Sequence, residues 1–208
     1  MRLVDRFKQN LAVVKAALKL THADVLSLNK KIKGEIFYTV KEYGRIIATS
    51  KPELAHLTGA YKPHFCNVVT LDASVLLARL MKDNSDPAAG VAYFALGTGN
   101  IGWNILSPPA PTGTEIALET EIERVIPSLA QFINTLTFLP SVTPTNIVDF
   151  DFDFTEAQAV GGLVECGLLG GDAGASPSIN DTLITYRTFP IISKTNTMTI
   201  SFTYRLTF

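Results

Sequence analysis

Residues 146–154 have the sequence Asn-Ile-Val-Asp-Phe-Asp-Phe-Asp-Phe, in which apolar and acidic side chains alternate from Val148 onward. The end of the chain alternates in the same way. From Met198 to Phe208 every second residue is large and apolar, and the residues between them are mostly Thr and Ser. Only a strand that is buried on one face and solvated on the other requires a period of two. Both stretches therefore predict half-buried strands of an antiparallel sheet.

Three apolar runs extend this sheet prediction outward. Val91–Leu96 is apolar throughout, which suits a strand that is covered on both faces. Val160–Leu169 and Leu183–Ile192 flank a glycine-rich loop at residues 170–178. Short strands that are separated by such loops are typical of an antiparallel sandwich.

A β-hairpin is predicted over residues 35–49. Glu35–Val40 and Arg45–Thr49 are β-prone, and Lys41-Glu42-Tyr43-Gly44 between them has the composition of a tight turn. Residues 34–208 are thus expected to form one mainly β (α+β) domain, an antiparallel β-sandwich.

Two short helices are predicted as insertions between the strands. The first covers residues 72–82, with Thr70 or Asp72 as its N-cap. The second covers residues 114–124, with Thr114 as its cap. Its candidate buried residues are Ile116, Leu118, Ile122 and Val125.

Residues 1–33 carry a helical period that ends before Gly34. Apolar residues recur alternately three and four positions apart, with Thr21 as the one weak position: Val4, Phe7, Leu11, Val14, Leu18, Val25, Leu28 and Ile32. This is the a/d seam of about four heptads. Its residue types favour a coiled coil of three or more helices over one of two. We expect this N-terminal helix to dock on another subunit or to form a homo-oligomer. The alternative is one helix, or two, packed on the chain's own domain, because Thr21 and Asp24 would form a capping box.

The composition excludes several classes of protein. Hydrophobic residues make up 47% of the chain and charged residues 18%, below the roughly 25% charged residues of an average soluble protein. The net charge of −1 favours neither nucleic acid nor an acidic membrane surface. Lys8, Lys15 and Lys19 interrupt the N-terminal apolar run, so neither a signal peptide nor a membrane span is expected.

One sequence motif formally suggests a nucleotide site. Residues 97–102 match G-x-G-x-x-G and follow the strand Val91–Leu96. The dinucleotide fingerprint needs a helix to start at its glycines. Trp103 and three prolines, Pro108, Pro109 and Pro111, follow instead. We therefore interpret the motif as a glycine-rich turn against which Trp103 packs, with no cofactor.

No metal site is predicted. Asp149, Asp151 and Asp153 follow one face of a strand, where neighbouring carboxylates stand about 7 Å apart, too far to share one ion without further ligands. A solvated face, or one that pairs with a basic neighbour, is the better interpretation. His64 and Cys66 lie two residues apart, but the sequence offers no second pair at metal-ligand spacing.

No catalytic residues are predicted either, since the sequence offers neither a G-x-S-x-G elbow nor a recognisable Ser-His-Asp set. Cys66 and Cys166 are expected to be buried free thiols. Glu165 lies in an apolar run, where it either is buried or, as we expect, points outward or pairs with Arg187 or Arg205.

Several segments between residues 68 and 208 resemble a family of small tailed-bacteriophage virion proteins. They are a Leu-Ala-Arg-rich helix at 69–81, an LGTG turn within Phe94–Gly99, a GLLGG strand end within Val164–Gly171, and a TFP segment at Tyr186–Lys194 followed by the terminal RLTF of Thr203–Phe208. Members of this family are usually called virion, tail-fibre or baseplate-type structural proteins. The resemblance implies a component of the phage particle and carries over no catalytic residues.

From the resemblance and the heptad seam we expect a non-enzymatic, tail-associated subunit of the baseplate, neck or fibre base. It would be made in the host cytoplasm and would enter the virion through contacts with other structural proteins. Two alternatives stay open. One is a capsid decoration or cement protein, and the other is a module that recognises a host-surface glycan through the loops at 97–111 or 170–178.

Overall fold

The computed structural model describes residues 33–57, 65–66, 68–82, 89–171, 173–178 and 180–208. By their contacts the residues separate into Met1–Ile32 and Lys33–Phe208. The eight seam residues from Val4 to Ile32 therefore lie outside the described residues, and their helix stays a prediction. The described part is mainly β, with its strands in two antiparallel sheets.

The larger sheet has seven strands in the order β2-β1-β12-β9-β7-β8, with β3 paired to β1 beside this path. Its strands are β1 (Lys33–Glu42), β2 (Arg45–Thr49), β3 (Phe65–Cys66), β7 (Leu129–Ile133), β8 (Pro140–Ser141), β9 (Ile147–Phe154) and β12 (Met198–Thr207). The two alternating stretches of the sequence, β9 and β12, are direct neighbours in this sheet. Its outermost strands are short, which limits the exposed edge.

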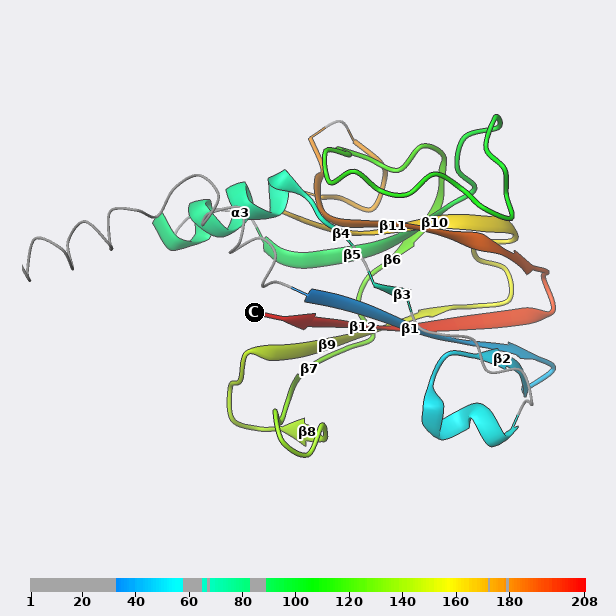
Figure 1. The fold of residues 1–208 in the computed structure, drawn as a ribbon, viewed down its shortest axis with the longest axis horizontal. Coiled ribbons are helices and arrows are strands. Elements are labelled where there is room, and N and C mark those ends of the chain that lie inside the picture. Colours follow the sequence, from blue (N-terminus) through cyan, green and yellow to red (C-terminus); the bar gives the residue numbers. More distant parts are fainter. Residues whose placement is uncertain (1–32, 58–64, 67, 83–88, 172, 179) are drawn as a thin grey trace, which may run out of the picture. The chain divides into compact units, whose positions relative to one another are not determined.

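The smaller sheet has five strands in the order β4-β11-β10-β5-β6. Its strands are β4 (Val68–Val69), β5 (Ala89–Gly97), β6 (Glu121–Val125), β10 (Gly161–Gly171) and β11 (Thr182–Lys194). Figure 1 shows the two sheets as stacked layers, with β10 and β11 in one layer and β1 and β12 in the other. The predicted antiparallel, sandwich-like architecture is confirmed.

An aromatic core fills the space between the sheets. Phe94 of β5 meets Phe152 of β9 and Phe202 of β12, in each case with ring centroids 5.0 Å apart. The predicted alternation is confirmed, because six apolar residues of β9 and β12 are buried: Phe152, Phe154, Ile200, Phe202, Tyr204 and Leu206. Burial of each such side chain stabilises the fold by about 1.5–3 kcal/mol.

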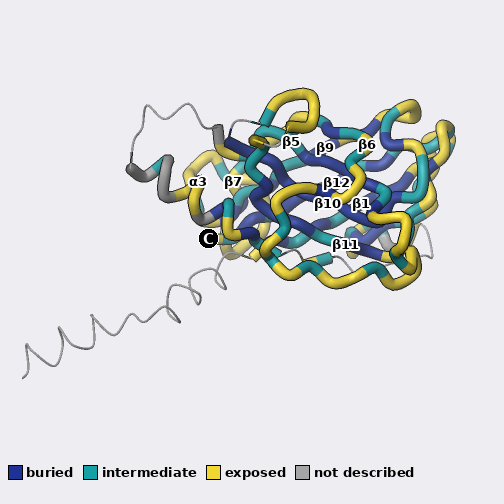
Figure 2. Tube along the Cα trace, turned by 90° about the horizontal axis from the view of Figure 1, so that it is seen from above, coloured by how far each residue is buried: buried dark blue, intermediate teal, exposed yellow. Residues whose placement is uncertain are grey.

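The outer face of the smaller sheet is also covered, by the long segment 98–120 between β5 and β6. This segment contributes Trp103 and Leu118 to a second apolar cluster with Ala95, Leu169, Leu183 and Tyr186. Because both faces are covered, β10 is buried over nearly its whole length (Figure 2). The same covering explains why Val91–Leu96 is apolar throughout, as predicted.

The first predicted helix is confirmed as α3 (Leu71–Lys82). Ala73 and Leu76 are buried against the core. The hydroxyl of Thr70 donates to the backbone oxygens of Leu183 and Ile184, so this residue ties the start of the helix to β11.

The second predicted helix, at 114–124, is wrong. Residues 114–120 are irregular, and Glu121–Val125 form β6 at the edge of the smaller sheet. Of the four residues expected to be buried, only Leu118 is; Ile116 is 73% exposed. One local and one tertiary contact hold this segment instead. The carboxylate of Glu115 accepts hydrogen bonds from the backbone N–H groups of Thr112 and Gly113, and the carboxylate of Glu165 accepts one from the backbone N–H of Thr120.

The predicted hairpin is confirmed, with a shorter turn. β1 continues through Lys41 and Glu42, which leaves Tyr43 and Gly44 as the turn residues. Both have positive φ angles, 48° and 77°, as a type I′ turn requires. The 3-10 helix η1 (Pro52–Leu57) follows β2.

Candidate functional site

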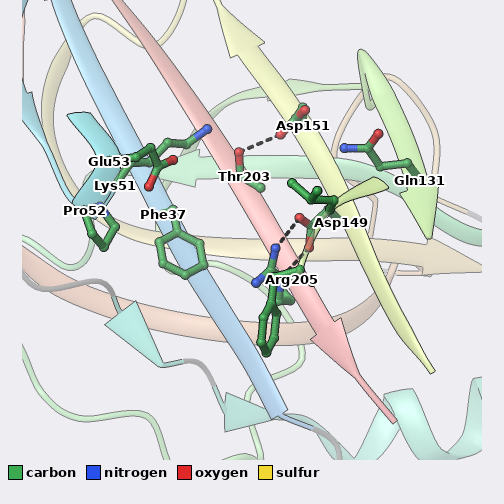
Figure 3. Close-up of a pocket in the computed structure, with 11 residues that line it drawn as sticks. Phe37, Lys51, Pro52, Glu53, Gln131, Asp149, Asp151, Thr203 and Arg205 are labelled. Atoms are coloured by element: carbon green, nitrogen blue, oxygen red, sulfur yellow. Dashed lines mark hydrogen bonds and ion pairs between the residues drawn. The ribbon is translucent and has the colours of Figure 1, made fainter. Parts of the chain in front are cut away.

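A groove of about 540 Å³ crosses the outer face of the seven-stranded sheet (Figure 3). Its floor consists of side chains from β1, β12, β9 and β7: Phe37, Thr203, Arg205, Asp149, Asp151 and Gln131. One wall is the start of η1, with Lys51, Pro52 and Glu53, and the other is the β7–β8 turn, with Phe138 and Leu139. Successive residues of each strand point alternately to the apolar core and to the outer face, so polar side chains lie on the outer face.

An ion pair occupies the centre of the floor. Arg205 donates from Nε and one Nη to the two carboxylate oxygens of Asp149, both at 2.7 Å. The hydrogen bonds that Arg205 donates to Asp149 raise the pKa of Arg205, which keeps the guanidinium charged. The rings of Phe37 and Phe138 have their centroids 5.9 and 5.8 Å from the guanidinium carbon. The fork geometry and the rings hold Arg205 in one orientation.

The acidic row of β9 is bound to β12 along its length. Asp151 accepts from the hydroxyl of Thr203 at 2.6 Å, and Asp153 accepts from that of Ser201 at 2.7 Å. Thus the row partly pairs with a basic neighbour, Arg205, and partly faces solvent, since Asp153 is exposed. Within the described residues, no group of three or more His, Cys, Asp and Glu side chains could hold a metal ion.

The glycine motif at 97–102 surrounds a buried carboxylate of the chain itself. Glu165 is fully buried and accepts four hydrogen bonds: from the backbone N–H of Gly99 at 3.1 Å, of Thr120 at 2.9 Å and of Glu119 at 3.1 Å, and from the hydroxyl of Tyr186 at 2.5 Å. A Cβ at Gly97 would lie 2.3 Å from the Glu165 carboxylate, and one at Gly99 would lie 2.5 Å from the ring of Trp103. The interpretation as a glycine-rich turn against Trp103 is confirmed.

The expectation that Glu165 points outward or pairs with Arg187 or Arg205 is wrong. Segment 98–120 covers the outer face of β10, so neither face of this strand is open to solvent. Arg205 belongs to the other sheet and binds Asp149. The carboxylate joins segment 98–120 to β10 and β11, which is a structural role.

The two cysteines are free, as predicted, but only Cys166 is buried; Cys66 is exposed at the short strand β3. Burial raises the pKa of the Cys166 thiol, which suppresses the reactive thiolate. His64 lies outside the described residues.

The groove itself was not predicted. The signal for its floor was present, because the polar faces of β9 and β12 are complementary: Asp149 lies opposite Arg205 and Asp151 lies opposite Thr203 in the strand register. The walls come from residues 51–53 and 138–139, which are far from these strands in sequence and carry no motif.

Buried tyrosines predict a loss of stability at alkaline pH. Burial and the hydrogen bond to Glu165 both raise the pKa of Tyr186 above 10.0. The stability linked to Tyr186 is therefore constant below pH 10 and falls above it, because only the unfolded chain then releases the phenolic proton. Each such group contributes about 1.4 kcal/mol per pH unit.

Tyr186→Phe should reduce the steepness of this alkaline loss by about 1.4 kcal/mol per pH unit, although the variant is less stable at neutral pH. Urea unfolding of the variant and the parent at a series of pH values on both sides of 10 measures the difference. The burial-raised pKa of Tyr204 stays in both proteins. Parallel curves for the two proteins above pH 10 would contradict the prediction.

Among the described helices, none is long and apolar enough to cross a membrane. No protein-family model matches the chain, and a search of curated proteins found no match.

Proposed function

We propose that this protein is a structural subunit of a tailed-phage particle and acts by assembling with other subunits. The location that we propose for it is the baseplate, the neck or the fibre base. The observation that carries the proposal is an exposed apolar hairpin at one edge of the seven-stranded sheet. The resemblance of residues 68–208 to phage virion proteins indicates that the particle is a phage virion.

The apolar hairpin comprises residues 126–142 and includes β7 and β8. Seven of its large apolar side chains are exposed: Ile126, Leu129, Phe132, Leu136, Phe138, Leu139 and Val142. Leu136 keeps 87% of its surface exposed, and β8 ends the strand order of the described sheet. Exposed apolar side chains on a hairpin at a sheet edge favour association with another protein.

Two buried cationic side chains of the described residues, Lys194 and Arg124, bind structural partners, which supports a non-catalytic role. Lys194 donates to the backbone oxygens of Thr155, Glu156 and Gln158 and so closes the β9–β10 connection. Arg124 binds Glu121 and Asp181 and so joins β6 to the segment before β11.

We expect the purified full chain to self-associate through the apolar hairpin. The combined substitutions Ile126→Ser, Leu136→Ser and Val142→Ser should weaken self-association about 100-fold, since each truncated contact is worth roughly 1 kcal/mol. These side chains are exposed in the single chain, so the fold should survive. Sedimentation velocity over a range of concentrations measures the effect.

A matched control carries the same kind of change on segment 98–120: Ile101→Ser, Leu106→Ser and Ile116→Ser, all exposed residues. This variant should associate like the parent. A parent that sediments as a monomer at every concentration, or a hairpin variant that associates as well as the parent, counts against assembly through this edge.

A further inference from the structure

We propose that the groove on the seven-stranded sheet is a binding site for a neutral oligosaccharide. This goes beyond the assembly role, because the floor side chains from β1, β12 and β9 and the wall at η1 lie outside the apolar hairpin, which contributes Gln131, Phe138 and Leu139 to the groove. The groove combines a rigid aromatic platform with polar side chains that are not used by the fold.

The platform consists of Arg205 and the two phenyl rings beside it. Asp149 takes two of the N–H groups of Arg205 and fixes the plane of the guanidinium. Phe37 comes from the floor and Phe138 from the wall at the β7–β8 turn, and the centroids of both rings lie within 6 Å of the guanidinium carbon. Phe138 is 58% exposed, so its ring, held in this way, offers an apolar surface to the C–H face of a sugar ring at little further cost in entropy.

Polar side chains on both sides of the platform have hydrogen-bonding capacity to spare. Within the part of the chain that the structure describes, the side chains of Lys51, Glu53 and Gln131 form no hydrogen bond, and Asp151 uses one of its two oxygens for Thr203. The set offers carboxylates as acceptors, an ammonium as a donor and an amide as both. Sugar hydroxyls both donate and accept, so they match such a mixed set.

Charge and geometry disfavour the other ligand classes. The lining holds three carboxylates, Glu53, Asp149 and Asp151, against two cations, Lys51 and Arg205, which repels phosphates and nucleic acid. A peptide that binds by strand addition needs a free sheet edge, whereas the floor here is a sheet face whose backbone is already paired between β1, β12 and β9. A volume of about 540 Å³ lies within the range of sites that hold small ligands.

The test is a titration of the full chain with soluble neutral oligosaccharides: maltohexaose, cellohexaose, chitohexaose and a dextran fragment. Isothermal calorimetry should detect binding of at least one of them. Gln131→Ala and Phe138→Ala should each weaken that binding at least about 10-fold, as expected for the loss of one well-placed contact. The matched controls are Asn180→Ala and Leu136→Ala, exposed polar and apolar positions outside the groove lining, which should bind like the parent.

Two results would overturn the proposal: no binding of any of the four sugars, or binding that both groove substitutions leave unchanged. A DNA oligonucleotide and an extended peptide serve as further probes, and groove-dependent binding of either one in place of the sugars also overturns it. The assembly role is judged separately, since Gln131→Ala should leave sedimentation unchanged.

Discussion

Replacing Glu165 with alanine is expected to lower the free energy of unfolding by about 4 kcal/mol, because four donors lose the acceptor that one buried side chain supplies. Three of these donors are backbone N–H groups of segment 98–120, and the fourth is the hydroxyl of Tyr186. Glu165 itself is fully buried, and Gly99 and Tyr186 are buried as well, so water replaces the lost acceptor least easily at these two donors. An ordinary hydrogen bond contributes about 0.5–1.5 kcal/mol net, so the loss of four together is large.

The single tryptophan reports on this site directly. Trp103 packs against Gly99, whose N–H binds Glu165, so its fluorescence should change when the segment detaches. In Glu165→Ala we expect the tryptophan signal to be lost at lower urea concentration than the far-ultraviolet circular dichroism of the sheets. In the parent the two signals should change together.

A conservative variant separates charge from shape. Glu165→Gln keeps one acceptor oxygen but points an amide N–H₂ toward backbone donors, so a loss of about 2 kcal/mol is expected. Glu156→Ala, at an exposed position, is the matched control and should change stability by less than about 0.5 kcal/mol. A Glu165→Ala protein as stable as this control would show that the carboxylate does not hold the segment.

Glu165 also shows where sequence reasoning stops. The alternation in β9 and β12 predicted strands correctly, since a period of two is a local property that follows from burial of one face. Whether a charged residue in an apolar strand points outward depends on what covers the strand. That cover, segment 98–120, is irregular and carries no period from which its position could be predicted.

The wrong helix at 114–124 has the same origin. Ile116, Leu118, Ile122 and Val125 have helix-like spacing, but Glu121–Val125 pairs with β5 instead. Tertiary contacts can outweigh helix propensity, which differs by under about 1 kcal/mol per residue among most residue types. The groove walls were missed for a related reason, because only the folded chain brings residues 51–53 and 138–139 to opposite sides of β12.

Phe94 is the residue on which the two sheets depend most, and Phe94→Ala is expected to cost about 4 kcal/mol of unfolding free energy. Its ring comes from the smaller sheet and lies among four rings of the larger one. These are Phe152, Phe154, Phe202 and Tyr204, with centroids between 5.0 and 6.2 Å away. The ring is fully buried and its neighbours belong to two paired strands, so the cavity left by alanine cannot collapse without moving β9 and β12.

Phe94→Leu should recover more than half of that loss, because leucine refills most of the volume. Phe138→Ala removes the same ring from an exposed position and should cost less than about 0.5 kcal/mol. Urea unfolding followed by circular dichroism gives all three values. A domain of this kind is stable by about 5–15 kcal/mol, so Phe94→Ala alone removes a large part of its stability. If Phe94→Ala costs no more than Phe138→Ala, the contact between the two sheets does not depend on this ring, and the aromatic core must draw its stability from the remaining pairs.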